Sequence, residues 1–243
     1  MALAASKRRH AKPRPLSLEG EAVLLDIEGT LGSISFVRDV LFAYSRERLS
    51  AFVETHREDP VVGDILAQAS SLAGGGDAVA ALQRWQDRDE KVPPLKKLQG
   101  LIWEDGYSTG AFQSPIFPDA LAALKRWNSA GLPLYIYSSG STQAQLLFFA
   151  HSTAGDLRAL FSGHFDTDVG AKTEAASYAL IAAQIGVTPG RIIFFSDNAK
   201  ELEAAQSAGL QVLHVVKEDT RPVPGLRRME NFDRVEIRRQ SSA

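Results

Sequence analysis

Cysteine is absent from this 243-residue chain. Its absence excludes disulfide bonds, thiolate catalysis and zinc sites built on cysteine, and it fits a protein of a reducing compartment. Long apolar runs are missing too, because no stretch reaches the roughly 18 residues that a membrane-spanning helix needs. The sequence therefore predicts neither a disulfide scaffold nor a membrane-spanning protein.

Excess charge of either sign is also lacking, since 27 lysines and arginines nearly balance 29 aspartates and glutamates, with a formal net charge of -2 at pH 7. This balance provides no overall attraction to nucleic acid or to an anionic membrane, and we expect neither as a partner. An acidic small-molecule substrate must then be held by local groups. The exception is residues 1–20, where basic residues cluster and no acid precedes Glu19. We predict a disordered basic tail there.

Strand-like and helical patterns alternate after residue 118, which predicts a Rossmann-like α/β fold: a parallel sheet with helices on both faces. Short apolar runs predict strands at residues 22–25, 132–137, 192–195 and 212–216. Helical patterns lie between them at residues 119–130, 142–150, 173–185 and 200–208.

Residues 36–113 lack strand-like alternation. Their apolar residues recur at spacings of three and four, as in Val40, Leu41 and Tyr44, which is typical of helices. Three glycines at 74–76 and the Pro93-Pro94 pair interrupt this pattern. We therefore predict a helical cap domain at residues 36–113, inserted into an α/β core formed by residues 21–35 and 114–243.

Polar residues end three of the predicted strands: Asp26 with Glu28, Ser138 with Ser139, and Ser196 with Asp197. In an open parallel sheet, ligands bind beyond the carboxyl ends of the strands, near the point where strand order reverses. The convergence of these residues predicts a functional site at that edge.

Asp26 and the segment Ser138-Ser139-Gly140 each have two interpretations. Asp26 can act as a nucleophilic carboxylate, or it can be a solvated acid in a turn. Ser138, Ser139 and Gly140 can bind a phosphate through hydroxyl and backbone N–H groups in front of a helix. Alternatively, they only cap that helix.

The remaining candidates are charged. Lys172 lies at the entry of a helix, where a cation is unfavourable, so it either neutralises the nucleophile and a phosphoryl group or is a surface lysine. Asp26 and Asp197 together can hold Mg2+, which prefers oxygen ligands. Glu201 can orient a metal-bound water or Lys172, or it can complement the helix dipole.

In chain order, these groups resemble the four sequence motifs of the haloacid dehalogenase superfamily: DIEGT at residues 26–30, SS at 138–139, Lys172, and SDNAKE at 196–201. The resemblance implies in-line attack of Asp26 on a phosphate ester, followed by hydrolysis of the aspartyl-phosphate by water. It also implies one Mg2+, which would bridge Asp26 and the phosphate with Asp197 as a further ligand.

Longer segments resemble the acireductone synthases, the enolase-phosphatases of methionine salvage. These segments are DIEGT itself, YIYSSGS at residues 135–141, Ala144-Gln145, GHFDT at 163–167, and LKKLQG at 95–100 with Trp103. The resemblance implies enolisation of 2,3-diketo-5-methylthiopentyl-1-phosphate and then its dephosphorylation to acireductone. It further implies a monomeric cytoplasmic enzyme whose partner is this small-molecule phosphate.

The same resemblance implies roles for individual residues. Glu28 matches a metal ligand that binds through its backbone carbonyl, and it is a candidate proton-transfer group. Ser139 and Gly140 match a substrate-contacting loop. Lys96 matches a cap lysine that reaches the site when the domains close, whereas Trp103 belongs either to the cap core or to the substrate contacts.

Three alternatives remain beside this hypothesis. The main one is a phosphatase of the same fold that acts on another small phosphate ester. A binding or regulatory protein on an inactive phosphatase scaffold is disfavoured because all four motifs are intact. A metal-free dehalogenase is disfavoured because Asp197 and the small hydroxyl of Ser138 suit a metal and a phosphate. Two segments depart from the expected patterns: Leu31-Gly32-Ser33 differs from the family after the first motif, and Asn198 stands where many members of the superfamily have a second Asp.

Overall fold

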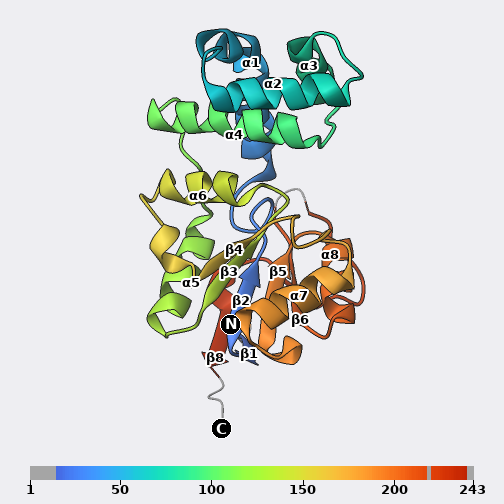
Figure 1. Cartoon of the computed structure of the whole chain (residues 1–243). Coiled ribbons are helices and arrows are strands. Elements are labelled where there is room, and N and C mark those ends of the chain that lie inside the picture. The colour runs from blue at the N-terminus through green and yellow to red at the C-terminus, as the bar shows by residue number, and fades with distance from the viewer. Residues whose placement is uncertain (1–14, 218–219, 240–243) are drawn as a thin grey trace, which may run out of the picture.

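The computed structural model describes residues 15–217 and 220–239. It has two tiers, an α/β core and a helical cap above it (Figure 1). The central sheet of the core has six parallel strands in the order β4-β3-β2-β5-β6-β7. In that order the strands are Gly163–Phe165, Leu134–Tyr137, Ala22–Leu25, Ile192–Ser196, Gln211–Val215 and Arg228–Met229.

The two middle strands, β2 and β5, are buried along their whole length. Successive side chains of β2 point to opposite faces, so Val23 and Leu25 enter one hydrophobic cluster while Ala22 and Leu24 enter another. Both faces therefore need a covering layer. This explains why the strands read as continuous apolar runs rather than as alternating ones.

Helices supply the covering layers. The face of Val23 packs against α5 (Pro118–Ser129) and α6 (Thr142–Ala150), and the face of Leu24 packs against α7 (Ala175–Ile185) and α8 (Ala199–Ser207). Short helical turns η2 (Arg158–Leu160), η3 (Pro189–Arg191) and η4 (Phe232–Arg234) join other segments. The predicted α/β class with helices on both faces of a parallel sheet is confirmed.

A second, two-stranded parallel sheet joins β1 (Leu16–Gly20) to β8 (Val235–Arg239). The predicted disordered tail at residues 1–20 is therefore wrong for residues 16–20, which form a strand. The tail prediction for residues 1–14 lies outside the described residues. Leu18 is buried in the same cluster as the central sheet, so the core begins earlier than residue 21.

The upper tier consists of η1 (Phe36–Phe42), α1 (Ala43–Thr55), α2 (Pro60–Leu72), α3 (Ala78–Asp87) and α4 (Pro93–Ser108). Asp59 and Asp77 accept hydrogen bonds from the first turns of α2 and α3, which fixes where these helices begin. The tier has its own apolar core, which includes Leu49, Leu82 and Leu98. The lower part of the tier also packs on the core, since Phe36, Leu41 and Tyr107 belong to the apolar cluster of the central sheet.

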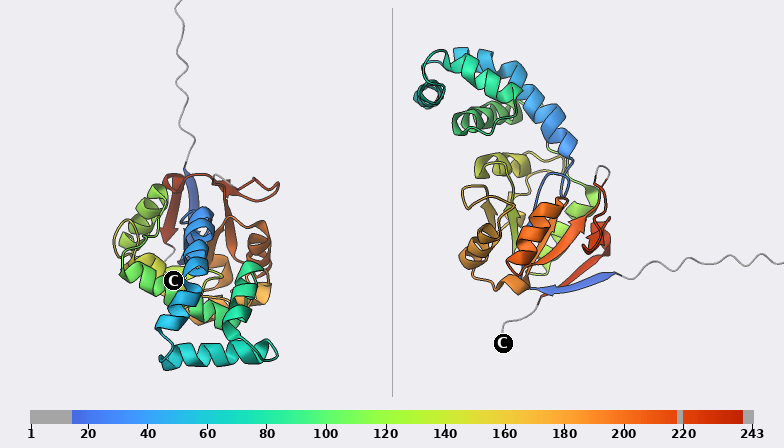
Figure 2. Two further views of the ribbon diagram at one scale, coloured as in Figure 1. Left: turned by 90° about the horizontal axis from the view of Figure 1, so that it is seen from above. Right: turned by 90° about the vertical axis from the view of Figure 1, so that its right-hand side faces the viewer.

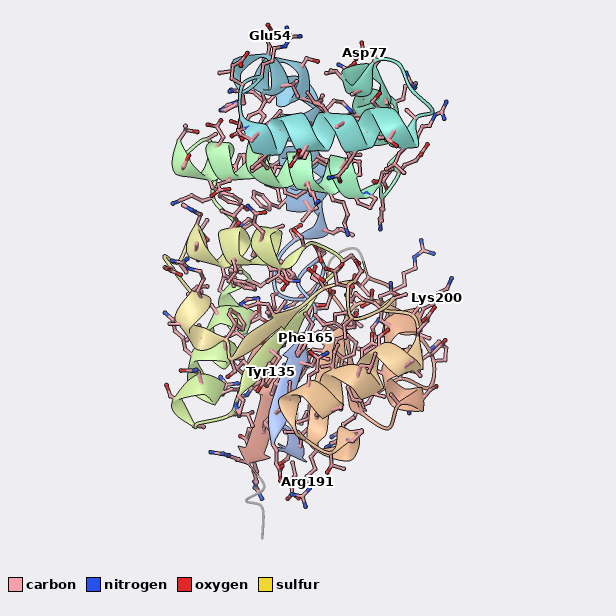
Figure 3. The ribbon with its side chains drawn as sticks, viewed as in Figure 1. Glu54, Asp77, Tyr135, Phe165, Arg191 and Lys200 are labelled. Atoms are coloured by element: carbon pink, nitrogen blue, oxygen red, sulfur yellow. The ribbon has the colours of Figure 1, made fainter. Side chains whose placement is uncertain are left out.

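The connection between the tiers is short. The η1–α1 segment rises directly from the core, and α4 lies over α6 (Figure 2). Glu54 and Asp77 lie at the outer end of the cap, whereas Arg191 lies at the opposite end of the molecule (Figure 3). Among the described residues, no helix is both long and apolar enough to cross a membrane.

Candidate active site between core and cap

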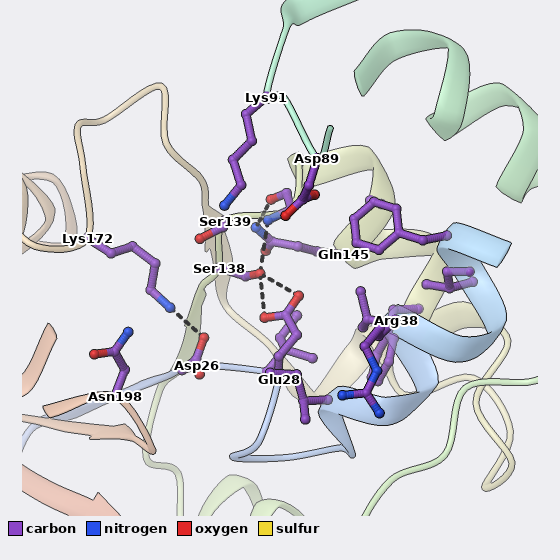
Figure 4. Close-up of a pocket in the computed structure, with 18 of the residues that line it drawn as sticks. Asp26, Glu28, Arg38, Asp89, Lys91, Ser138, Ser139, Gln145, Lys172 and Asn198 are labelled. Carbon is purple, nitrogen blue, oxygen red and sulfur yellow. Dashed lines mark hydrogen bonds and ion pairs between the residues drawn. The ribbon is translucent and has the colours of Figure 1, made fainter. Parts of the chain in front are cut away.

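A cleft of about 1080 Å³ separates the cap from the carboxyl ends of β2, β3 and β5. Core residues line its floor and cap residues line its roof (Figure 4). The floor includes Asp26, Glu28, Ser138, Ser139, Gly140, Lys172, Asp197 and Glu201, and the roof includes Arg38, Asp89, Lys91, Lys96 and Trp103. The polar residues that follow β2, β3 and β5 therefore meet at the carboxyl edge of the sheet, where the sequence predicted a functional site.

Asp26 is the first residue after β2, and its side chain is fixed from both sides. Its backbone N–H donates to the Phe195 carbonyl at 3.0 Å, which continues the sheet by one residue. Its Oδ1 accepts a hydrogen bond from Lys172 Nζ at 2.5 Å, and its Oδ2 accepts one from Thr30 Oγ1 at 3.3 Å. The residue is only 3% exposed, so it is a preorganised carboxylate at the floor of the cleft.

Lys172 is buried, at 6% exposure, and forms ion pairs with Asp26 and with Glu201 Oε2, the latter at 2.7 Å. Burial alone would lower the pKa of this ammonium group, but the two carboxylates outweigh burial and raise its pKa overall. Lys172 therefore stays positively charged. The interpretation of Lys172 as a surface lysine is wrong.

Asp197 follows β5 and lies next to the nucleophile candidate. Its backbone N–H donates to Thr30 Oγ1 at 3.1 Å, so one threonine hydroxyl contacts both motifs. Gly29 has φ +73°, and a side chain there would collide with the Asp197 carboxylate. Burial and the negative charge of Asp26 raise the pKa of Asp197 to about 7. The site thus holds more negative charge than it neutralises.

Glu28 reaches across to the second motif. Ser138 Oγ donates to its two carboxylate oxygens at 3.1 and 3.3 Å, and the Gly140 N–H donates to Ser138 Oγ at 3.1 Å. Burial and the charge of Asp26 raise the pKa of Glu28. This carboxyl group is therefore poised to carry a proton more readily than an ordinary glutamate.

Glu201 completes the charged cluster. Burial, followed by the charge of Asp26, raises the pKa of Glu201 to about 7 even though Lys172 and Ser196 oppose the rise. Its contact with Lys172 favours the interpretation that Glu201 orients that lysine. Four carboxyl groups then surround one buried ammonium group, and a cation or a protonation must balance them.

The candidate metal ligands are the carboxylates of Asp26 and Asp197 and the backbone carbonyl of Glu28. Oxygen ligands of this kind suit a hard cation. No three acidic or histidine side chains within residues 15–217 and 220–239 are grouped so that they could hold a metal by themselves. A metal bound by Asp26 and Asp197 would therefore need a backbone carbonyl, water or a ligand to complete its shell. Mg2+ tolerates such sites because it retains water and binds phosphate oxygens.

The cap residues lie at the rim rather than on the floor. Lys96 Nζ donates to Thr167 Oγ1 at 3.3 Å, so the structure places it at the end of β4 rather than at Ser138. Trp103 donates from Nε1 to the Leu41 carbonyl at 2.8 Å and packs edge-on against Phe42. Trp103 also lines the cleft, and it packs against the apolar cluster of the central sheet rather than that of the cap.

Several cleft residues were missed by the sequence analysis. Lys91 extends from the cap toward Ser139, and Arg38 lies on the η1 side of the cleft near Glu28 (Figure 4). Asp89, on the loop before Lys91, has φ 52° and is the one non-glycine residue at positive φ in the described ranges. Nothing in the sequence marked these three residues as functional, because charged residues are common in loops and on helix surfaces.

Sequence comparison relates the chain to known hydrolases. Residues 21–209 match the profile of haloacid dehalogenase-like hydrolases. Enolase-phosphatase E1 of Bradyrhizobium sp. strain BTAi1 is 60% identical over 92% of this chain and 97% of its own length. The Aquifex aeolicus protein of the same name is 45% identical over 89% of this chain and 99% of its own.

Comparison with solved structures also finds proteins of similar fold. The crystal structure of the Saccharomyces cerevisiae UTR4 protein superposes with a TM-score of 0.77 at 34% identity, covering 88% of this chain and 99% of that one. CbbY from Rhodobacter sphaeroides, in complex with xylulose-1,5-bisphosphate, gives a TM-score of 0.61 at 21% identity, over 90% and 97% of the two chains. The second similarity concerns the fold alone.

Proposed function

Because the chain belongs to the enolase-phosphatases, within the haloacid dehalogenase-like hydrolases, we propose that it converts 2,3-diketo-5-methylthiopentyl-1-phosphate to acireductone and phosphate. The single observation that carries this proposal is the buried Asp26–Lys172 pair at 2.5 Å, facing a cleft large enough for a small phosphate ester. A fixed carboxylate beside a fixed cation suits attack on an anionic ester.

In the phosphatase step, a carboxylate oxygen of Asp26 forms a bond to phosphorus while the bond to the ester oxygen breaks. The electron pair goes to the leaving oxygen, which takes up a proton. Water then attacks the aspartyl-phosphate and regenerates Asp26 with release of phosphate. Lys172 lowers the repulsion between the two anions that must meet in the first of these attacks.

One Mg2+ per molecule belongs to this proposal. Asp26, Asp197 and the backbone carbonyl of Glu28 would hold it, and their oxygen atoms suit it. When bound, it supplies positive charge for the phosphate and for the enediolate. The raised pKa of Asp197 supports the assignment, because it reflects burial and the nearby negative charge of Asp26, both of which a bound cation would offset.

In the enolase step, a proton leaves a carbon next to a carbonyl group. Glu28 is our candidate base for this transfer, because its raised pKa makes its carboxylate a stronger base and the hydrogen bond from Ser138 holds that carboxylate in the cleft. The cap covers the site and restricts water, which otherwise competes for the enediolate. Lys96 approaches the substrate from the cap side when the cleft narrows.

We also place the enzyme in the cytoplasm, as a monomer without nucleic-acid or membrane partners. The absence of cysteine supports the compartment, and the balanced charge supports the lack of nucleic-acid and membrane partners. The monomeric state rests only on the resemblance to the family.

The test is phosphate release from the diketone phosphate with and without Mg2+, combined with ultraviolet absorbance of the enediol. Wild type should produce both signals only with Mg2+, and Asp26→Asn should release no phosphate. Asp64→Asn, an exposed cap variant, is the matched control and should behave as wild type. Release from other phosphate esters but none from this one would contradict the assigned substrate and favour the alternative phosphatase.

A further inference from the structure

Gln145 is a buried residue of α6 whose role the proposed reaction does not explain. It is 1% exposed. Its Nε2 donates to the Gly140 carbonyl at 2.9 Å and to the Phe165 carbonyl at 2.8 Å, and its Oε1 pairs with His164 Nδ1 at 3.2 Å. Both N–H groups and the oxygen of the amide are therefore used.

These partners determine the orientation of every group in the network. Carbonyl oxygens only accept, so the amide nitrogen of Gln145 must face Gly140 and Phe165. Its oxygen must then face His164, which has to donate from Nδ1. Burial lowers the pKa of His164, which favours the neutral ring, and the ring lies beside Phe149 and Phe161. His164 thus has one defined tautomer and one partner for it.

The network acts on the loop of residues 138–141, which connects β3 to α6 and lines the cleft. A phosphate is attracted by the N–H groups of such a loop and repelled by its carbonyl oxygens. Within the described part of the chain, the Ser139 and Ser141 amides make no hydrogen bond, whereas the Gly140 carbonyl is held by Gln145. Without that tie, the peptide after a glycine is free to turn its oxygen into the cleft.

The far end of the same loop is held from β4 as well. Asp166 Oδ2 accepts hydrogen bonds from the Thr142 N–H at 2.8 Å and from the Thr142 hydroxyl at 3.1 Å. Phe165 contributes its carbonyl to both Gln145 and the Ser138 N–H. The GHFDT segment, which stood out in the sequence, is therefore a brace for the 138–141 loop.

We propose that Gln145, oriented by His164, is a positioning residue that keeps the N–H side of the 138–141 loop toward the phosphate of the substrate. This proposal rests on the proposed function only in that a phosphate binds at this loop. Gln145 acts through the Gly140 carbonyl and touches neither Asp26 nor Asp197. Its loss weakens phosphate binding more than it slows the chemistry at Asp26.

The first experiment replaces Gln145 by Glu, which keeps the shape but faces two carbonyl oxygens with a carboxylate. The probes are inorganic phosphate as an inhibitor and a simple aryl phosphate as substrate. We expect the inhibition constant and KM to rise about tenfold or more, the usual scale for an unpaired buried group, with kcat changed by less than about threefold. Gln184→Glu, on the exposed face of α7, adds the same charge and should change neither.

The second experiment separates positioning from mere packing. His164→Asn retains a donor near the place of Nδ1, whereas His164→Leu does not. Both remove the ring from its aromatic neighbours, so both should lower the melting temperature, but only the leucine variant should raise KM. Equal KM values for these two variants would overturn the role of His164.

The outcomes also keep the two proposals apart. If wild type neither binds phosphate nor hydrolyses any phosphate ester, the proposed function fails. If wild type does both and Gln145→Glu has unchanged KM, or loses kcat alone, the positioning role of Gln145 is wrong.

Discussion

The core and the cap bury different kinds of residue. The buried acidic and basic side chains of the described residues, Asp26, Lys172, Glu201 and His214, all belong to the core. The buried polar residues of the cap are the uncharged Ser45, Gln86 and Gln99. The core therefore contains the buried charges, whose burial lowers its stability. The cap is held together mainly by apolar packing and contributes residues to the cleft.

This contrast implies that substitutions in the two tiers should fail in different ways. Changes to the charged cluster of the core should reduce turnover in protein that still folds. Changes inside the cap should reduce stability, or the affinity for substrate, without altering the chemistry of the folded enzyme.

The largest expected effect comes from Lys172→Met in the core. Without the ammonium group, Asp26 and Glu201 repel each other and the incoming phosphate, so kcat should fall by about 10³-fold. Turnover at saturating Mg2+ measures this effect, and Lys125→Met on the exposed face of α5 is the control. A loss below tenfold would make the ion pairs of Lys172 structural only.

Leu82→Ala tests the cap. Leu82 is fully buried in the cap cluster, so its truncation should lower the free energy of unfolding by about 2–5 kcal/mol. The kcat of the folded fraction should remain that of wild type. Leu72→Ala, at a residue that is 60% exposed, should have little effect on either. A reduced kcat with unchanged stability would remove the distinction between the two tiers.

The pH dependence of stability provides a third test, in metal-free protein. The pKa of Asp197 and that of Glu201 are raised to about 7, so the folded state binds these protons more tightly than the unfolded chain. Stability from these groups is therefore full near pH 4 and is lost as the pH rises through 7. Urea unfolding with a chelator should give a higher free energy at pH 5 than at pH 8.

Asp197→Asn should reduce that pH difference, because the substituted residue no longer titrates. Asp64→Asn in the cap should leave it intact. Identical pH profiles for wild type and Asp197→Asn would mean that the charged cluster is not the source of the dependence.

The smallest effects are expected at the boundary of the tiers. Lys96→Met should raise KM by about tenfold through loss of one charged contact, while Lys97→Met, its exposed neighbour, should not. Thr167→Val removes the part-buried hydrogen bond that Lys96 makes in this structure and should change KM by less than about threefold. A larger effect from Thr167 than from Lys96 would place the functional contact at Thr167 instead.

The sequence was informative wherever a side chain follows directly from a buried strand. Asp26 and Asp197 come at once after β2 and β5, whose apolar runs are unambiguous, and the parallel register brings Leu25 beside Phe195. The two acids must then lie at the same edge. Ser138 is placed by the same argument through β3.

The strands that were missed are short or depend on distant partners. β4 and β7 contain three and two residues, which is too few for a periodic pattern. β1 and β8 carry polar residues, and each exists because the other pairs with it. Likewise, nothing local showed that Gln145 would meet His164 and Gly140, since these contacts arise only when α6 packs against β4.

The β1–β8 sheet has a consequence for how the chain is made. The parallel pairing joins Leu16 to Val235 and Gly20 to Arg239, so β1 is synthesised long before the segment that pairs with it. During translation, β1 must remain without its partner while the rest of the core emerges from the ribosome. Pairings across such a sequence distance form slowly, and we expect this small sheet to close only after the central sheet has formed.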